Sequence, residues 1–172
     1  MLMTESNLPA PEHAPNHSNR ATTIGWDLAG ILLGMLTGAI GTVVHLNSYW
    51  TGSFGLPWGV VLALVIVWLA QRWISLRSAS IVATGLTGIA QYVTLAVMVA
   101  LNQGNHFSVP LNDQTWEFVP HLVLATLAWN IGIVAVTLLS LIQLTRTIRR
   151  TKAELAANQA YLTPAVGPQD KQ

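Results

Sequence analysis

Residues 30–45 read GILLGMLTGAIGTVVH and lie in an apolar run that is too long for the core helix of a small soluble domain. At about 100° per residue, a helix brings Gly30, Gly34, Gly38, Gly41 and His45 within roughly a quarter of its circumference. In water, each glycine would cost such a helix about 1 kcal/mol relative to alanine. In a bilayer, the same residues let another backbone approach closely, which is how membrane helices associate. The stretch therefore predicts a packing face on a membrane-spanning helix.

The composition of the whole chain agrees with this interpretation. The 172 residues are 52% hydrophobic and 9% charged, whereas soluble domains carry about a quarter charged residues. The sequence has no cysteine, which excludes disulfides, thiolate metal sites and cysteine nucleophiles. The net charge of +1 is too small to indicate nucleic-acid binding. We therefore expect the lipid bilayer to be the main surrounding of this chain.

Four apolar runs predict an all-α fold, an integral membrane bundle of four transmembrane helices in two hairpins. Pro57 and Pro120 open the second and fourth runs, at the position where a helix tolerates proline. The expected spans are residues 24–46, 57–76, 79–101 and 120–144, within a transmembrane domain of residues 24–146. A polar, disordered tail is expected over residues 1–23, and a partly helical tail over residues 147–172.

The cations predict the orientation of the spans. The loops of residues 47–56 and 102–119 contain no lysine or arginine, and the positive-inside rule places such loops outside the cell. The cations that flank the spans all fall on the opposite side; they are Arg20, Arg72, Arg77, Arg146, Arg149, Arg150 and Lys152. Trp26 and Trp73 fit an inner aromatic belt, and Trp50, Trp58 and Trp116 fit an outer one. The chain is thus expected to be a multi-pass plasma-membrane protein with both termini in the cytoplasm.

Two amides interrupt the third and fourth spans at similar depth. Counted along the expected helices, Gln91 and Asn130 differ in depth by about 3 Å, so the sequence predicts a buried hydrogen-bonded clasp between them. Gly88 shares a helix face with Gln91 and is a further candidate packing residue. A polar path for an ion or solute is the alternative interpretation. Its lining would be Thr84, Gly88, Gln91, Thr126, Asn130 and Thr137.

Asp27 and Arg72 are the charged residues that lie about one turn inside the ends of the first two spans. We expect them to form an ion pair, since pairing lowers the cost of holding two charges near the membrane. A carboxylate that handles protons is the functional alternative for Asp27.

Three histidines are expected at or near the outer surface: His45, His106 and His121. Asp113 and Glu117 lie in the same loop as His106. Imidazoles and carboxylates together can bind zinc or copper, or relay a proton, and His45 with His121 is the candidate pair. Their spacing matches no known ligand motif, so we expect no metal and no cofactor. A metal or quinone site on this pair remains the alternative.

Residues 55–64 read GLPWGVVLAL and follow the glycine-rich first span. In this respect the chain resembles a family of small four-helix membrane proteins of actinobacteria, over roughly its first two spans. The resemblance implies the four-helix fold but no activity, because none is established for that family. Some actinobacterial membrane proteins of this size are accessory subunits of the respiratory cytochrome supercomplex.

The sequence shows none of the usual catalytic patterns, such as a Ser-His-Asp order, a zinc-protease helix or a phosphate-binding loop. We therefore expect a protein without enzymatic activity that acts as an accessory or assembly subunit of a larger membrane complex, for example a respiratory supercomplex. Its expected partner is another membrane protein or a second copy of the chain. A small oligomeric transporter or channel is the alternative.

Overall fold

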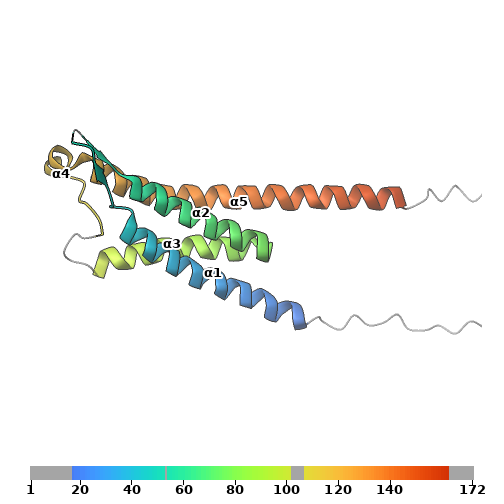
Figure 1. The fold of residues 1–172 in the computed structure, drawn as a ribbon. Coiled ribbons are helices and arrows are strands. Elements are labelled where there is room, and N and C mark those ends of the chain that lie inside the picture. Colours follow the sequence, from blue (N-terminus) through green and yellow to red (C-terminus); the bar gives the residue numbers. More distant parts are fainter. Residues whose placement is uncertain (1–16, 53, 102–106, 163–172) are drawn as a thin grey trace, which may run out of the picture.

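The computed structural model describes residues 17–52, 54–101 and 107–162, and these residues are mostly helical (Figure 1). The elements in chain order are α1 (His17–Val44), β1 (Tyr49–Trp50), β2 (Gly55–Leu56), α2 (Trp58–Ser78), α3 (Ile81–Leu101), α4 (Asp113–Phe118) and α5 (Pro120–Leu162). Four helices, α1, α2, α3 and α5, are long and apolar enough to cross a membrane. The prediction of a helical chain with four candidate spans is thus confirmed.

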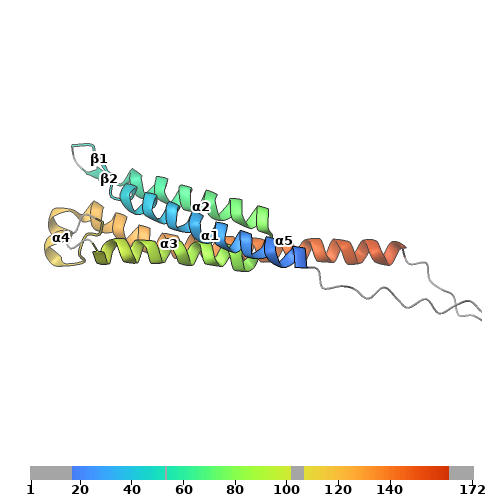
Figure 2. The ribbon, with the colours of Figure 1, turned by 90° about the horizontal axis from the view of Figure 1, so that it is seen from below.

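The four long helices lie side by side as one bundle (Figures 1 and 2). α1 and α3 run in one direction, and α2 and α5 run in the other (Figure 1). Helices that follow one another in sequence do touch, but α1 packs more extensively on α3 than on α2. The expected division of the bundle into two hairpins is therefore not confirmed, because the largest interface joins the first hairpin to the second.

Helix α1 begins at His17 and so includes part of the tail that the sequence predicts to be disordered. Residues 17–24 contain neither proline nor glycine, so the stretch lacks the two residues that oppose a helix most strongly. The rest of the predicted tail, residues 1–16, lies outside the described residues.

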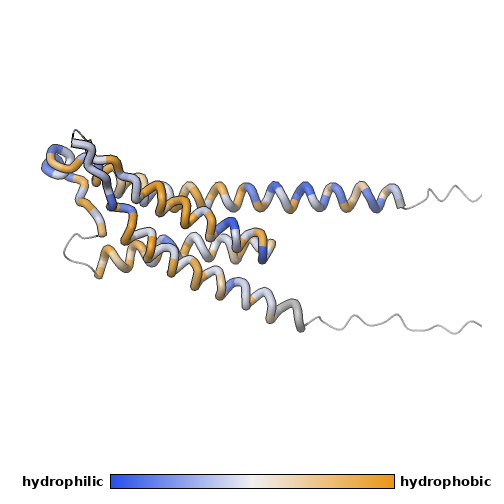
Figure 3. The backbone as a smooth tube through the Cα atoms, in the orientation of Figure 1, coloured by the Kyte–Doolittle hydropathy of each residue, from blue (hydrophilic) through white to orange (hydrophobic). Residues whose placement is uncertain are grey.

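Helix α5 continues for 43 residues, or about 64 Å, without a break. It projects beyond the ends of α2 and α3, and the projecting part is more polar than the part inside the bundle (Figures 1 and 3). The sequence predicts only a brief extension here. The alanines of residues 153–160 explain the difference, because alanine is the strongest helix former. We call this end of the bundle the cation-rich end, since Arg77, Arg146, Arg149, Arg150 and Lys152 all lie there.

The opposite end carries two small elements that the sequence analysis treats as turns and loops. β1 and β2 pair antiparallel, with Tyr49 opposite Leu56 and Trp50 opposite Gly55. The short helix α4 begins at a capping box, in which the Asn112 side chain accepts from the backbone N–H of Thr115 and the Thr115 hydroxyl accepts from the backbone N–H of Asn112. We call this the loop end (Figure 1).

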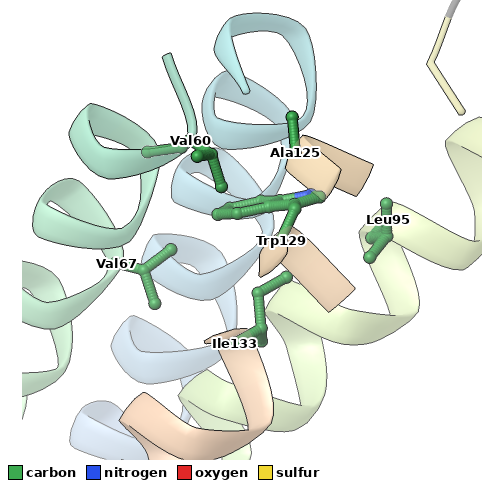
Figure 4. Close-up of a cluster of buried hydrophobic side chains, with 7 residues drawn as sticks. Val60, Val67, Leu95, Ala125, Trp129 and Ile133 are labelled. Atoms are coloured by element: carbon green, nitrogen blue, oxygen red, sulfur yellow. The ribbon is translucent and has the colours of Figure 1, made fainter. Parts of the chain in front are cut away.

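A tryptophan occupies the centre of the apolar core. Trp129 of α5 is fully buried, and side chains from α2, α3 and α5 surround it (Figure 4). The cluster consists of Val60, Ala63, Val67, Leu95, Ala125, Trp129 and Ile133. Large apolar side chains also cover the outside of the bundle, for example Leu32, Val61 and Ile131, which are 67%, 63% and 65% exposed. An outer surface this apolar is typical of a protein that lies in lipid.

Candidate functional site

The glycines of α1 form the contact with α3. A Cβ atom added to Gly30 would lie 2.8 Å from the carbonyl oxygen of Ala83, and one added to Gly38 would lie 2.8 Å from that of Gln91. At Gly34 the added atom would collide with the carbonyl oxygen of Thr87. No side chain fits at such distances unless the backbone shifts. The predicted packing face therefore exists, and it is used inside the bundle.

The remaining predicted packing glycines contact α5. An added Cβ at Gly41 would collide with the ring of Trp129, and one at Gly88 would collide with Thr137. All five predicted glycines are thus buried against neighbouring helices of the same chain. The face of α1 that the sequence offers to a partner is occupied by α3 and α5.

Four polar side chains, one from each long helix, meet in the interior. The amide nitrogen of Gln71 donates to Gln91 Oε1 at 2.7 Å and to Thr137 Oγ1 at 2.7 Å. The amide nitrogen of Gln91 donates to Thr37 Oγ1 at 3.0 Å. The Thr37 and Thr137 hydroxyls in turn donate to backbone carbonyls of their own helices. We call Thr37, Gln71, Gln91 and Thr137 the amide network.

The amide network links α1, α2, α3 and α5, and both glutamines are 0% exposed. In an apolar interior an amide without a partner is costly, so each of these bonds specifies how the helices are rotated against one another. One acceptor, Gln71 Oε1, has no partner among the described residues. The amide network therefore fixes how the four long helices are rotated against one another.

The structure corrects the predicted partner of Gln91. Asn130 is only partly buried and donates to the backbone carbonyl of Thr126, one turn earlier in its own helix, at 2.8 Å. The clasp thus joins Gln91 to Gln71 instead of Asn130. The depth counted from the sequence is wrong for Asn130, because the α5 residue at the level of Gln91 is Thr137, which bonds to the same amide nitrogen of Gln71. Thr137 lies seven residues, or about two turns, further along nearly the same side of α5.

The predicted ion pair between Asp27 and Arg72 is absent from the described part of the chain. Asp27 Oδ1 is buried without a hydrogen-bond partner there, and Arg72 Nη1 donates to Gln143 Oε1 of α5 at 3.3 Å. The ends of α1 and α2 meet instead through Trp26 and Trp73, whose ring centroids lie 6.1 Å apart in an edge-to-face arrangement. The hydrogen bond that the Arg72 side chain makes is thus with α5 and not with Asp27 of α1.

His45, the first residue after α1, is fully buried and stacks on Trp129 with ring centroids 5.6 Å apart. Its Nδ1 lies 2.8 Å from the carbonyl oxygen of Thr42, and its Nε2 has no partner within the described part of the chain. Burial lowers the pKa of His45 below its ordinary value, although the backbone hydrogen bonds at Thr42 and Gly41 oppose the shift. The neutral ring is therefore a packing element of the bundle.

His121 has different neighbours, because it lies beside Trp50 and against Gly55 of the β1–β2 hairpin. No group of three or more His, Cys, Asp or Glu residues that could hold a metal occurs in residues 17–52, 54–101 and 107–162. Asp113 and Glu117 lie on α4 as exposed residues. His106 lies outside the described residues.

Two apolar grooves flank the outward face of α3. One, of about 270 Å³, lies between α3 and α5, with Ile133 and Leu138 among its walls. The other, of about 350 Å³, lies between α1 and α3, with Met35 among its walls. Ile89 and Val93 line both grooves and form the ridge between them. We call this surface the α3 ridge.

Sequence reasoning missed two central residues. The sequence alone does not predict the burial of Gln71, because this residue stands directly before Arg72 and Trp73, which mark a helix end. Its depth is nevertheless a signal, since it lies seven residues before the end of α2. Trp129 lies nine residues, or about 14 Å, beyond Pro120. That depth is too great for an interfacial belt and indicates a core position.

No family model, curated protein or solved structure matches this chain. The resemblance of residues 55–64 to a family of small membrane proteins stays a prediction.

Proposed function

We propose that this chain is a four-span integral membrane protein without catalytic activity, which serves as an accessory or assembly subunit of a larger membrane complex. The observation that carries the proposal is the α3 ridge, an apolar ridge with a groove on each side. The internal polar groups and glycines, by contrast, are already used to hold the bundle together.

Membrane placement is supported by the four candidate spans and by the separation of charge between the two ends of the bundle. The positive-inside rule favours a cytoplasmic location for the cation-rich end, and with it both termini. Exposed tryptophans occur near both ends, as expected for interfacial belts: Trp73 is 49% exposed, Trp50 62% and Trp116 42%. The plasma membrane is the membrane that we propose.

The α3 ridge has the shape that a neighbouring transmembrane helix requires. Ile89 and Val93 are 61% and 52% exposed and lie four residues apart, so they stack along one side of α3. Helices pack by placing the ridges of one between the ridges of the other. A helix of a partner membrane protein would thus fit into either groove, with Ile89 and Val93 along its flank.

The transporter alternative gains less support from the geometry. Its proposed lining residues bond to other buried side chains of the bundle or to backbone: Gln91 to Gln71 and Thr37, Thr84 to the carbonyl of Ser80, and Asn130 to that of Thr126. A conducting path needs polar groups that face water, whereas these groups are already hydrogen-bonded within the bundle. A partner-binding role leaves the amide network closed, as it is here.

The proposal is tested by isolating the tagged full-length chain in a mild detergent and identifying stoichiometric partners by mass spectrometry. We expect one membrane-protein complex to be recovered with the wild type. Val93→Trp fills both grooves and should release that partner. Val65→Trp is the matched control, because Val65 is 44% exposed on α2 and lines neither groove.

Recovery of the partner with Val93→Trp at wild-type stoichiometry would contradict the assignment of the α3 ridge. A pure homo-oligomer would favour the transporter, and ion or solute flux through liposomes that contain the purified chain would then be measured. A chain that is always monomeric would contradict the accessory role.

A further inference from the structure

A second kind of groove lies at the cation-rich end, where α2 stops at Ser78 and α5 continues to Leu162. Beyond Ser78, α2 no longer covers the side of α5 on which it packs, and a groove of about 420 Å³ lies there. Its walls include Arg72, Leu76 and Ala79 beside Leu144, Ile148 and Lys152. We call it the α2–α5 groove. Its volume lies within the range of about 300–1,000 Å³ that is typical of small-molecule sites.

The charges of the α2–α5 groove are of one sign. Arg72 and Lys152 are the charged residues among the described residues that line it, and no carboxylate lines it. One N–H group of Arg72 donates to Gln143, so most of its five donors are left for a ligand. The hydroxyls of Thr147 and Thr151 donate to carbonyls of their own helix. A ligand in this groove therefore meets donors from two cations.

The two cations sit at opposite ends of an apolar floor. Arg72 lies six residues, or about 9 Å, before the end of α2, at the level of Gln143. Lys152 lies nine residues, or about 14 Å, further along α5 than Gln143. Leu76, Leu144 and Ile148 line the groove between them. Long basic side chains can extend along such a surface and turn their charge towards a headgroup.

We propose that the α2–α5 groove binds the phosphate headgroup of an anionic phospholipid, with the beginning of an acyl chain on Leu76 and Ile148. The inference rests on the proposed membrane placement, but not on the existence of a protein partner. Basic grooves between helices at the cytoplasmic side of a membrane are suited to anionic headgroups. The apolar floor favours a lipid over a soluble phosphate, because a free phosphate has nothing to place there.

The test uses the full chain in nanodiscs of phosphatidylcholine with or without phosphatidylglycerol, followed by native mass spectrometry of the released protein. We expect phosphatidylglycerol to be retained in preference to phosphatidylcholine. Arg72→Gln and Lys152→Gln should each weaken retention about fivefold, which corresponds to about 1 kcal/mol per cation. Arg149→Gln and Arg150→Gln are matched controls, because they remove the same charge nearby without lining the groove.

Three results would overturn the proposal: equal retention of the two lipids, equal loss in the control variants, or displacement of phosphatidylglycerol by inorganic phosphate. Lys152 is exposed on the projecting part of α5 and makes no bond to Gln143, so Lys152→Gln tests the groove independently of the Arg72 bond to Gln143. A chain that does not enter nanodiscs at all would instead refute the membrane placement. Failure to recover a protein partner would leave lipid binding intact.

Discussion

Replacement of Gln71 by leucine tests the amide network most directly. Leucine has nearly the volume of glutamine, so Gln71→Leu removes hydrogen bonds with little change in packing. The variant loses the bonds from Gln71 to Gln91 Oε1 and to Thr137 Oγ1, both 2.7 Å long in the wild type. It also leaves Gln91 Oε1 without its donor, at a residue that is 0% exposed.

The magnitude follows from those losses. Two interhelical hydrogen bonds within a membrane contribute about 0.6 kcal/mol each, or about 1 kcal/mol together. The stranded oxygen of Gln91 adds about 1–3 kcal/mol. Removal of Gln71 Oε1, which has no partner in the described part of the chain, offsets part of this cost. We expect the free energy of unfolding to fall by about 2 kcal/mol.

Unfolding is measured by titrating the protein in mild-detergent micelles with sodium dodecyl sulfate and following helix content by circular dichroism. The double variant Gln71→Leu/Gln91→Leu removes the stranded oxygen, so its cost should be at least about 1 kcal/mol less than the sum of the two single costs. Gln143→Leu is the matched control, since Gln143 is exposed and should change stability by less than about 0.5 kcal/mol.

Additive single costs, within about 0.5 kcal/mol, would refute the reasoning, because groups that bond to each other cannot act independently. If Gln71→Leu lowers the free energy of unfolding by no more than Gln143→Leu does, the amide network does not fix the rotation of the four helices, and the proposed role is wrong.

The other predictions concern packing and protonation, and each is measured as a change in stability in the same micelles. Gly34→Ala should lower the free energy of unfolding by about 1–3 kcal/mol, because the added methyl group collides with α3. Gly25→Ala adds a methyl group that meets nothing within 4 Å and should be neutral or stabilising, so equal effects of the two variants would contradict the α1–α3 contact. Trp129→Ala should cost about 3–5 kcal/mol and Trp68→Ala, whose ring is 41% exposed, markedly less; the reverse order would refute the core assignment. The folded chain disfavours protonation of His45. The contribution of the neutral ring to the free energy of unfolding is therefore present above the ordinary pKa of 6.5 and is lost as the pH falls below it. A wild-type melting temperature that falls no further than that of His45→Phe between about pH 7 and 5 would disprove this.

Much of the fold could be predicted from the sequence because it depends on properties of single segments. Apolar length predicts the four candidate spans, and Pro120 correctly marks the start of α5. Glycine periodicity predicts that α1 has a packing face, since spacing alone decides which residues share a side of a helix. The same periodicity says nothing about whether α3 or another protein covers that face.

The pairing of polar residues could not be predicted, because it depends on the rotation of each helix and on which helices are neighbours. Gln91 is buried, as expected, but its partner Gln71 is selected by the contact of α2 with α3. Asp27 and Arg72 are predicted at similar depth, and Arg72 nevertheless bonds to Gln143 of α5. The α3 ridge likewise arises only when α1, α3 and α5 lie beside one another, and the α2–α5 groove only because α5 continues beyond α2.

The measurement that tests the central claim most directly is the accessibility of single cysteines to a membrane-impermeant maleimide in intact cells. The chain has no cysteine of its own, so Ser48→Cys, Gln114→Cys and Asn158→Cys each report one position, and all three are exposed. Four membrane-crossing helices with both termini in the cytoplasm predict labelling at positions 48 and 114, and at position 158 only after the membrane is permeabilised. Labelling of position 158 in intact cells, or recovery of the chain in the soluble fraction, would contradict the account.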